Sequence, residues 1–275
     1  MIRTWLVVGF VAVLALAAGV SALRGEPRAK PAGLAEPKAP RPDITGPYVP
    51  APGSLRGEIV FAREGSCSSI DLASLEMTRA AGSRICKRLQ ALSSPASTAP
   101  APSSLFLGDA FLDARDLALG FTPGTTGDVR VAGFAKRPDG LAAVVAIGYR
   151  AGEGGMPSEL VLELWRRGRL EAAVQLPSAV DPGGVANLGS VVRFSPDGAE
   201  VAVSALGERA PLVLYDVRSL ALVLGPTGQH GFAWSPDGAW FALAREEGIA
   251  VHGAERSSPA YVFPVAADAL AWRAS

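Results

Sequence analysis

The chain has 275 residues, 26 basic and 26 acidic side chains, and a formal net charge of zero. This balance argues against a nucleic-acid-binding protein, because such proteins carry a basic excess or a basic stripe. Only two histidines are present, His230 and His252, which leaves little material for acid–base or metal chemistry. The length suffices for one large domain, or two small ones, with a sizeable hydrophobic core.

The N-terminus predicts a segment that enters a membrane. After the short flank 1–4, residues 5–23 (WLVVGFVAVLALAAGVSAL) carry no charge. This length, at about 1.5 Å per residue, matches a hydrocarbon core of about 30 Å and favours a transmembrane anchor. The alternative is a signal peptide cleaved near Ala22. Both place the rest of the chain outside the cytoplasm, although the basic residues that follow the segment favour the opposite orientation.

Residues 24–56 are predicted to form a linker, since they hold eight of the chain's 22 prolines. Proline removes backbone donors and favours extended segments, so we expect a semi-rigid stalk between the membrane and a folded domain at 57–275. Recognition of these prolines by a partner is the alternative.

Cys67 and Cys86 are the only cysteines in the sequence. Their spacing differs from a redox C-x-x-C motif, and two thiols with two distant histidines make a poor zinc site. In an exported protein an isolated pair predicts a disulfide. Closing a loop of about 20 residues stabilises a fold by about 3 kcal/mol in the chain-entropy model. In a cytosolic protein both thiols would be reduced, so this prediction depends on export.

One turn occurs three times, as RPDG at 137–140 and as SPDG at 195–198 and 235–238. Proline presets the second position of a type I turn, and aspartate tolerates the third. Glycine then takes the left-handed conformation that a three-residue hairpin with a bulge requires. Each turn is therefore expected to join two antiparallel strands. The turn residues are Pro138, Asp139, Gly140, Ser195, Pro196, Asp197, Gly198, Ser235, Pro236, Asp237 and Gly238.

Two further strands are expected after each hairpin, which gives a unit of four antiparallel strands. The unit recurs 40 residues later, from Pro196 to Pro236. Four strands in about 40 residues is the size of one propeller blade. The copy around Pro138 lies further from the next copy, so insertions are expected at 151–159 and 178–189.

The two ends of the folded region each resemble half a blade. We expect residues 268–273 to pair with 57–64 and to close a ring, which removes exposed strand edges. Residues 87–128 are the least regular part and contain two candidate strands, SLFLGDAF and RDLALGF, in a degenerate blade or a long loop. The predicted fold class is all-β, a short propeller of four or five blades. Five is favoured, because 57–275 divides into five units of about 45 residues.

The FSPDG and WSPDG turns, with the downstream LVLYD strand, resemble WD40-like repeats of the TolB propeller family. Residues 193–216 and 233–251 match well, and the repeat around Pro138 matches loosely. The resemblance implies an extracytoplasmic propeller and says little about function, since propellers host many activities. The chain departs from that family in having fewer predicted blades and no second α/β domain.

No catalytic residue, cofactor or metal site is predicted. The sequence lacks a nucleophile elbow, an H-E-x-x-H motif, a Walker A loop and a dinucleotide fingerprint. His230 directly precedes the expected inner strand GFAW, a position beside a central channel, and His252 lies on the third strand of the same unit. A structural role is favoured for both histidines. The turn aspartates are attributed to local backbone hydrogen bonds rather than to a calcium ring.

Two groups of side chains are candidates for a contact surface. Trp234, Trp240 and Trp272 are expected to pack within blades, although Trp240 lies beside a turn and is a candidate contact residue. The basic cluster Arg166, Arg167 and Arg169 is assigned to a solvated hairpin tip. Contact with an acidic lipid or partner is the alternative for these arginines.

The sequence as a whole predicts a membrane-anchored, extracytoplasmic propeller that binds a protein, peptide or cell-envelope partner without catalysis and without nucleic acid. The alternative is a secreted or tethered enzyme, of lyase or glycosidase type, with its site in the propeller channel. Carboxylates or histidines clustered on channel-facing strands would favour the enzyme.

Overall fold

The computed structural model describes part of the unit Ala39–Ser275. The described residues are 43–44 (backbone), 55–79, 84–92, 103–108, 110–123, 127–150, 155–205, 210–253 and 256–274. The predicted anchor at 5–23 and most of the predicted linker lie outside these ranges. Within them, no helix is long and apolar enough to span a bilayer.

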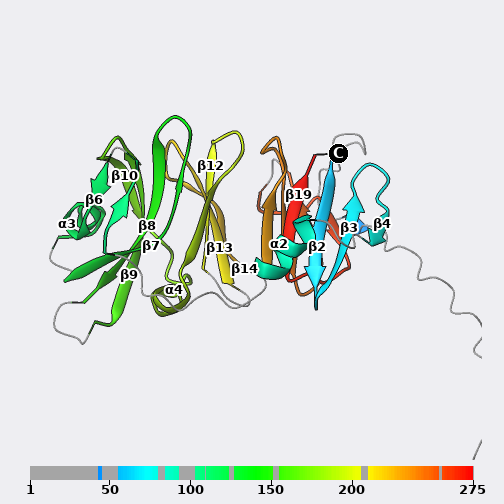
Figure 1. Ribbon diagram of the computed structural model, residues 1–275, viewed down its shortest axis with the longest axis horizontal. Helices are drawn as coiled ribbons and strands as arrows, with labels where there is room; N and C mark the ends of the chain where they lie inside the picture. Colours follow the sequence, from blue (N-terminus) through cyan, green and yellow to red (C-terminus); the bar gives the residue numbers. More distant parts are fainter. Residues whose placement is uncertain are drawn as a thin grey trace, which may run out of the picture. The chain divides into compact units, whose positions relative to one another are not determined.

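Four antiparallel sheets form the described domain (Figure 1). Sheet 1 has the order β19 (Ala269–Arg273), β2 (Glu58–Arg63), β3 (Ser66–Asp71), β4 (Met77–Arg79), and sheet 2 has the order β7 (Asp128–Lys136), β8 (Leu141–Tyr149), β9 (Pro157–Arg166), β10 (Arg169–Gln175). Sheet 3 consists of β11 (Ser190–Phe194), β12 (Glu200–Ala205), β13 (Ala210–Asp216) and β14 (Leu222–Gln229). Sheet 4 consists of β15 (Gly231–Trp234), β16 (Phe241–Arg245), β17 (Gly248–His252), β18 (Tyr261–Phe263) and β1 (Asp43–Ile44). The all-β, propeller-like fold class is confirmed.

The three repeated turns form the first hairpins of sheets 2, 3 and 4. In each, the glycine N–H donates to the carbonyl three residues earlier, at 2.8 to 3.0 Å. Gly140, Gly198 and Gly238 have φ values of +87°, +73° and +77°, the left-handed region that favours glycine. The turn chemistry read from the sequence therefore accounts for these hairpins.

The C-terminal strand completes the first sheet, as predicted. β19 pairs antiparallel with β2, in a register that runs from Ala269 opposite Ala62 to Arg273 opposite Glu58. The Trp272 indole N–H donates to the Arg56 carbonyl at 3.1 Å, which fixes the chain just before β2. The segments 58–63 and 269–273 are thus held in one sheet.

Hydrophobic clusters join the sheets in the order 2, 3, 4, 1. One cluster joins sheets 2 and 3, a second joins sheets 3 and 4, and a third joins sheets 4 and 1. No cluster of the described residues joins sheet 1 directly to sheet 2. Segments between these two sheets cover their remaining faces instead: α2 (Arg84–Leu92) packs on sheet 1, and β5 (Leu105–Phe106), β6 (Phe111–Leu112) and α3 (Ala114–Leu117) pack on sheet 2.

The prediction of a strand at RDLALGF is wrong, because these residues form α3 and the 3₁₀ helix η2 (Ala118–Gly120). Asp113 starts α3: its carboxylate accepts from the N–H groups of Arg115 and Asp116, and the Asp116 carboxylate accepts from the Asp113 N–H. This reciprocal capping stabilises a helix start. A fifth blade was favoured in the region 87–128. The described part of that region, before β7 begins, contains one sheet, the two-stranded β5–β6 sheet.

Two expected irregular segments contain regular structure. Two residues of the predicted linker form β1, which pairs with β18. The insertion at 178–189 contains α4 (Pro182–Leu188), whose N-terminus is capped by the Asp181 carboxylate.

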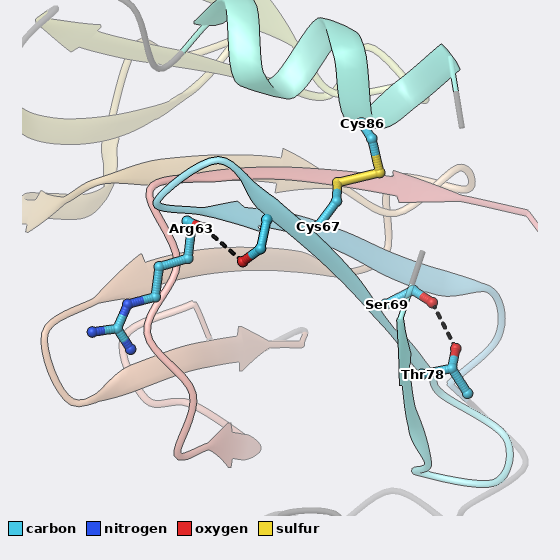
Figure 2. The surroundings of a disulfide bond; sticks show 6 residues. Arg63, Cys67, Ser69, Thr78 and Cys86 are labelled. Atoms are coloured by element: carbon cyan, nitrogen blue, oxygen red, sulfur yellow. Dashed lines mark hydrogen bonds between the residues drawn. A yellow bond between two sulfur atoms is a disulfide. The ribbon is translucent and has the colours of Figure 1, made fainter. Parts of the chain in front are cut away.

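The predicted disulfide is confirmed. Cys67 of β3 is bonded to Cys86 of α2, with the Cα atoms 5.8 Å apart (Figure 2). Both residues are buried with Val60 and Leu89 between the helix and sheet 1. The bond therefore fixes α2 to the face of sheet 1 that no other sheet covers.

Replacing both cysteines by alanine is expected to lower the free energy of unfolding by about 3 kcal/mol, because the bond closes a loop between residues 19 apart. Urea unfolding of the wild type and the double variant measures the difference. The oxidised wild type should show no free thiol under denaturing conditions. Two titratable thiols, or equal unfolding midpoints, would contradict this prediction.

Deleting residues 268–275 is expected to destabilise the domain by more than about 4 kcal/mol, because it removes β19 and uncovers both β2 and the cluster between sheets 4 and 1. Calorimetry of the truncated and intact chains tests this. A melting temperature within a few degrees of the wild type would show that the β19–β2 pairing is dispensable.

Candidate functional site

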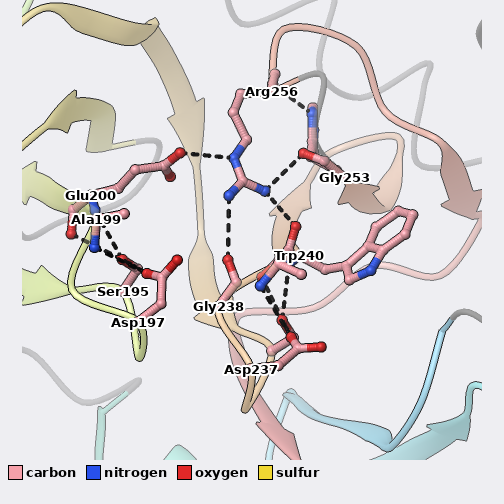
Figure 3. Close-up of polar contacts among 12 residues, drawn as sticks. Ser195, Asp197, Ala199, Glu200, Asp237, Gly238, Trp240, Gly253 and Arg256 are labelled. Atoms are coloured by element: carbon pink, nitrogen blue, oxygen red, sulfur yellow. Dashed lines mark hydrogen bonds and ion pairs between the residues drawn. The ribbon is translucent and has the colours of Figure 1, made fainter.

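The repeated aspartates are engaged within their own turns. The Ser195 hydroxyl donates to Asp197 Oδ1 at 2.5 Å, and the Ser235 hydroxyl donates to Asp237 Oδ1 at 2.6 Å. Each serine oxygen also accepts the N–H of the residue five positions later, at 2.9 Å. The Ser235 hydroxyl lowers the pKa of Asp237. These contacts define S-P-D-G as a hydrogen-bonded unit that sets the geometry of the hairpin (Figure 3).

The first copy of the turn carries arginine in place of this serine. The Arg137 guanidinium donates to the Gly198 carbonyl at 2.7 Å and pairs with Asp139 at 3.1 Å. The substitution therefore links the turn of sheet 2 to the turn of sheet 3.

Arg256 joins sheets 3 and 4 at the end of their interface where the two S-P-D-G turns lie. Its Nε lies 3.1 Å from Glu200 Oε1, and its Nη1 donates to the carbonyls of Ala239 and Gly253 at 2.7 Å (Figure 3). The guanidinium also lies 5.5 to 5.6 Å from the ring centroids of Phe241 and Trp234. No sequence motif marked Arg256, because all these partners are distant in the sequence or are backbone atoms.

His252 packs within sheet 4. Its ring stacks on Phe241 at a centroid distance of 4.7 Å, and Nδ1 lies 2.9 Å from the Arg256 carbonyl. Burial lowers the pKa of His252 to about 4, so the ring is neutral at neutral pH.

Sequence reasoning missed Glu163, a fully buried carboxyl on β9. Its Oε2 accepts from the Trp165 indole N–H at 2.7 Å, and Oε1 faces the backbone of Gly120 in η2. Burial raises the pKa of Glu163 to about 8. The alternation of polar and apolar residues in this segment predicted a strand. No neighbouring residue indicated that η2 would cover the face of β9 that carries Glu163.

The predicted contact residues lie apart. Arg166 pairs with Glu171 and Asp139, at 2.8 and 3.5 Å, while Arg167 and Arg169 are exposed at the β9–β10 hairpin. Trp240 is half-buried against the cluster between sheets 4 and 1. The structure therefore does not bring Trp240 and the arginines into one surface.

A cavity of about 150 Å³ lies where the innermost strands of sheets 3, 4 and 1 begin. Close strand approaches lie on both sides of it. A Cβ atom added at Gly133 of β7 would lie 2.5 Å from the Ser190 carbonyl oxygen of β11, and one added at Gly231 of β15 would lie 3.0 Å from the Ala269 Cα of β19. The cavity occupies the remaining space between β11 and β15.

The cavity has a buried apolar interior and a polar opening. Its buried lining residues are mostly apolar, with Leu212 and Leu270 as the largest, and the half-buried Phe232 adds a further apolar wall. Exposed Arg193 and Asp268, with half-buried His230, line the same space. The cavity thus combines His230, which the sequence placed near a channel, with charged residues that no motif had marked.

The amide of Gln229 has a fixed orientation. Its Nε2 donates to the Ser204 hydroxyl at 2.8 Å, and that hydroxyl donates to the Ala205 carbonyl at 2.9 Å. Because the hydroxyl proton is already used, the serine oxygen must accept from the amide. Gln229 Oε1 is therefore a buried acceptor, and it has no partner among the described residues. Among those residues, no cluster of three metal-binding side chains is found.

No protein-family model and no curated protein matches this chain. Solved structures with some similarity include the hydrazine synthase of Kuenenia stuttgartiensis, at 13% identity and a TM-score of 0.30 over 68% of this chain and 46% of that chain. A putative 6-phosphogluconolactonase from Bacteroides uniformis matches at 12% identity and a TM-score of 0.30, over 78% of this chain and 71% of that one. XC5397 of Xanthomonas campestris, described as a gluconolactonase, matches at 15% identity and 0.28, over 54% of this chain and 51% of that one. The chain thus spans about half the length of two of these three proteins. These values establish no family.

The free energy of unfolding is expected to fall by about 2 kcal/mol between pH 6.5 and 8, because folded Glu163 holds a proton there that the unfolded chain has lost. Between about pH 4.5 and 6.5 the lowered pKa of His252 contributes a slope of the opposite sign, which offsets that of Glu163, so the wild type should change little there. Urea unfolding of the wild type and of Glu163→Gln at several pH values separates the two contributions. Glu163→Gln should abolish the fall above pH 6.5, and the exposed control Glu76→Gln should retain it. A fall that persists in Glu163→Gln would contradict this assignment.

Proposed function

We propose that residues 57–275 form a non-catalytic binding module held outside the cytoplasm. The buried disulfide supports this location, because such bonds persist in oxidising compartments. The uncharged segment 5–23 supports a membrane anchor, and the proline-rich linker supports a stalk. Partners of the module are a protein, a peptide or a cell-envelope component.

We further propose four blades, with 84–123 as an insertion that covers sheets 1 and 2 where a fifth blade would stand. The four large sheets and the cover provided by α2 and the β5–η2 segment support this count. A relationship to TolB-like propellers is proposed from the two S-P-D-G repeats and their common hydrogen bonds.

The cavity carries the proposed binding function. Its lining combines apolar side chains with the exposed Arg193 and Asp268 and the half-buried His230. A few fixed polar groups in an apolar recess are typical of ligand sites.

An enzyme is the second candidate, because the cavity brings a histidine and a carboxylate together. His230 and Asp268 come from segments just before β15 and β19, and both line the cavity with Arg193. These side chains are of the types that serve as general acids and bases. The Asp268 carboxylate already accepts the Glu64 N–H at 3.0 Å, which also gives it a structural role.

Thermal unfolding of the full-length chain against a panel of peptides, sugars, phenols and amines tests this function. A ligand at 100 times its Kd should add about 2.7 kcal/mol, which raises the melting temperature by several degrees. Mass spectrometry of each stabilising compound should show that it is recovered unchanged. Turnover would favour the enzyme, and a panel without any stabilising compound would contradict the binding proposal.

A further inference from the structure

We propose that the exposed face of α2 docks on a bilayer surface that carries anionic lipids. This basic face consists of Arg84, Lys87 and Arg88, which are all exposed. It belongs to a different part of the domain from the cavity, and the inference draws on the membrane anchor of the proposed function.

The basic face points away from the fold. Residues three and four positions apart lie on one side of a helix, so Arg84, Lys87 and Arg88 lie together. Cys86 and Leu89 occupy the opposite side of α2 and are buried against sheet 1. The disulfide of Cys86 holds the helix on the sheet in this orientation (Figure 2). The three cations are therefore presented to solvent on a rigid support.

Helix stability does not account for this placement. The three basic residues lie within the first five positions of α2, and its first turn holds no acidic residue. The N-terminal end of a helix carries a partial positive charge, so cations are unfavourable there. Like charges three and four positions apart also repel one another. An arrangement that weakens the helix points to a partner of opposite charge.

The acidic side chains of sheet 1 do not neutralise the basic face. The sequence holds no aspartate or glutamate from 77 to 108, although it holds four basic residues there. In the described strands of sheet 1, the acidic residues are Glu58 and Asp71. Glu58 accepts from Arg273 Nε at 2.6 Å, and Asp71 accepts from N–H groups of its own turn. The positive charge of α2 is thus left for a partner.

The position of α2 in the chain favours a bilayer as the source of negative charge. The linker 24–56 leads directly into sheet 1 at β2, and it holds six basic and three acidic residues. When extended, this linker reaches about 110 Å, so a domain anchored by 5–23 stays near the membrane surface. Each basic side chain at an anionic bilayer strengthens binding about fivefold. The tether raises the effective concentration of that surface, so three such side chains are enough to orient the domain.

Lysine acetylation of the full-length chain tests the inference. The chain is reconstituted in nanodiscs of phosphatidylcholine, with or without about 30% phosphatidylglycerol, and treated with a membrane-impermeant reagent. Mass spectrometry follows Lys87 and, as the internal control, the exposed Lys136 of β7. Acetylation of Lys87 should be at least about fivefold slower in the anionic nanodiscs, whereas Lys136 should react equally in both. High salt should remove the difference, because it screens the attraction.

Arg84→Glu combined with Arg88→Glu keeps the reporter lysine and reverses the charge around it, so Lys87 should then react equally in both nanodiscs. Arg167→Glu combined with Arg169→Glu changes the net charge by the same amount at the exposed β9–β10 hairpin and should retain the protection.

Equal acetylation of wild-type Lys87 in the two nanodiscs overturns the inference, and this comparison needs no variant. Protection that persists in the α2 variant overturns it as well. Co-migration of the chain with neutral nanodiscs tests the anchor separately. A chain that stays free of them contradicts the anchor, while the lysine comparison still decides the docking.

Discussion

Every sheet of this domain has to bury two apolar faces, and this constraint governs the arrangement of the rest of the chain. All nine residues of β8 are buried, although antiparallel strands usually alternate between core and solvent. Sheets 3 and 4 meet the requirement by packing between other sheets. Sheets 1 and 2 each have one face that no other sheet covers among the described residues, and α2 and the β5–η2 segment cover these faces. The helix α2 and the β5–η2 segment are therefore part of the core.

The interface between sheets 3 and 4 has different properties at its two ends, and β12 connects them. At its start, Glu200 binds Arg256, which is joined to the S-P-D-G turn of sheet 4 by backbone carbonyls. At its end, Ser204 orients Gln229 beside the cavity. At the Glu200 end, the little-exposed ion pair with Arg256 joins the two sheets. At the Ser204 end, the cavity separates them.

Local patterns predicted the parts of the fold that local chemistry determines. The S-P-D-G turns specified hairpins because serine, aspartate and glycine make their contacts within six residues. The sequence also repeats the pattern D-x-x-S-L, at 71–75 and 216–220. In both copies the aspartate accepts from the serine N–H and hydroxyl, and the leucine has a positive φ, +61° at Leu75 and +51° at Leu220.

The candidate site was less predictable, because its residues meet only in the folded chain. Gln229 and Ser204 are 25 residues apart, and neither belongs to a motif. The carboxyl of Glu163 is buried by η2, more than 40 positions earlier in the chain, in a segment for which the sequence predicted a strand. His230 was placed near the channel because its position before β15 follows from the repeat. Long-range packing, in contrast to turn chemistry, leaves no short-range pattern in the sequence.

The pairing of β1 with β18 has a mechanical consequence. A pull on the chain from its N-terminal side reaches this two-residue strand before it reaches sheet 1. Two residue pairs oppose the load there, whereas β2 is held between β19 and β3 along its whole length. Under such a load β1 would therefore detach while the pairing of β2 in sheet 1 is still intact.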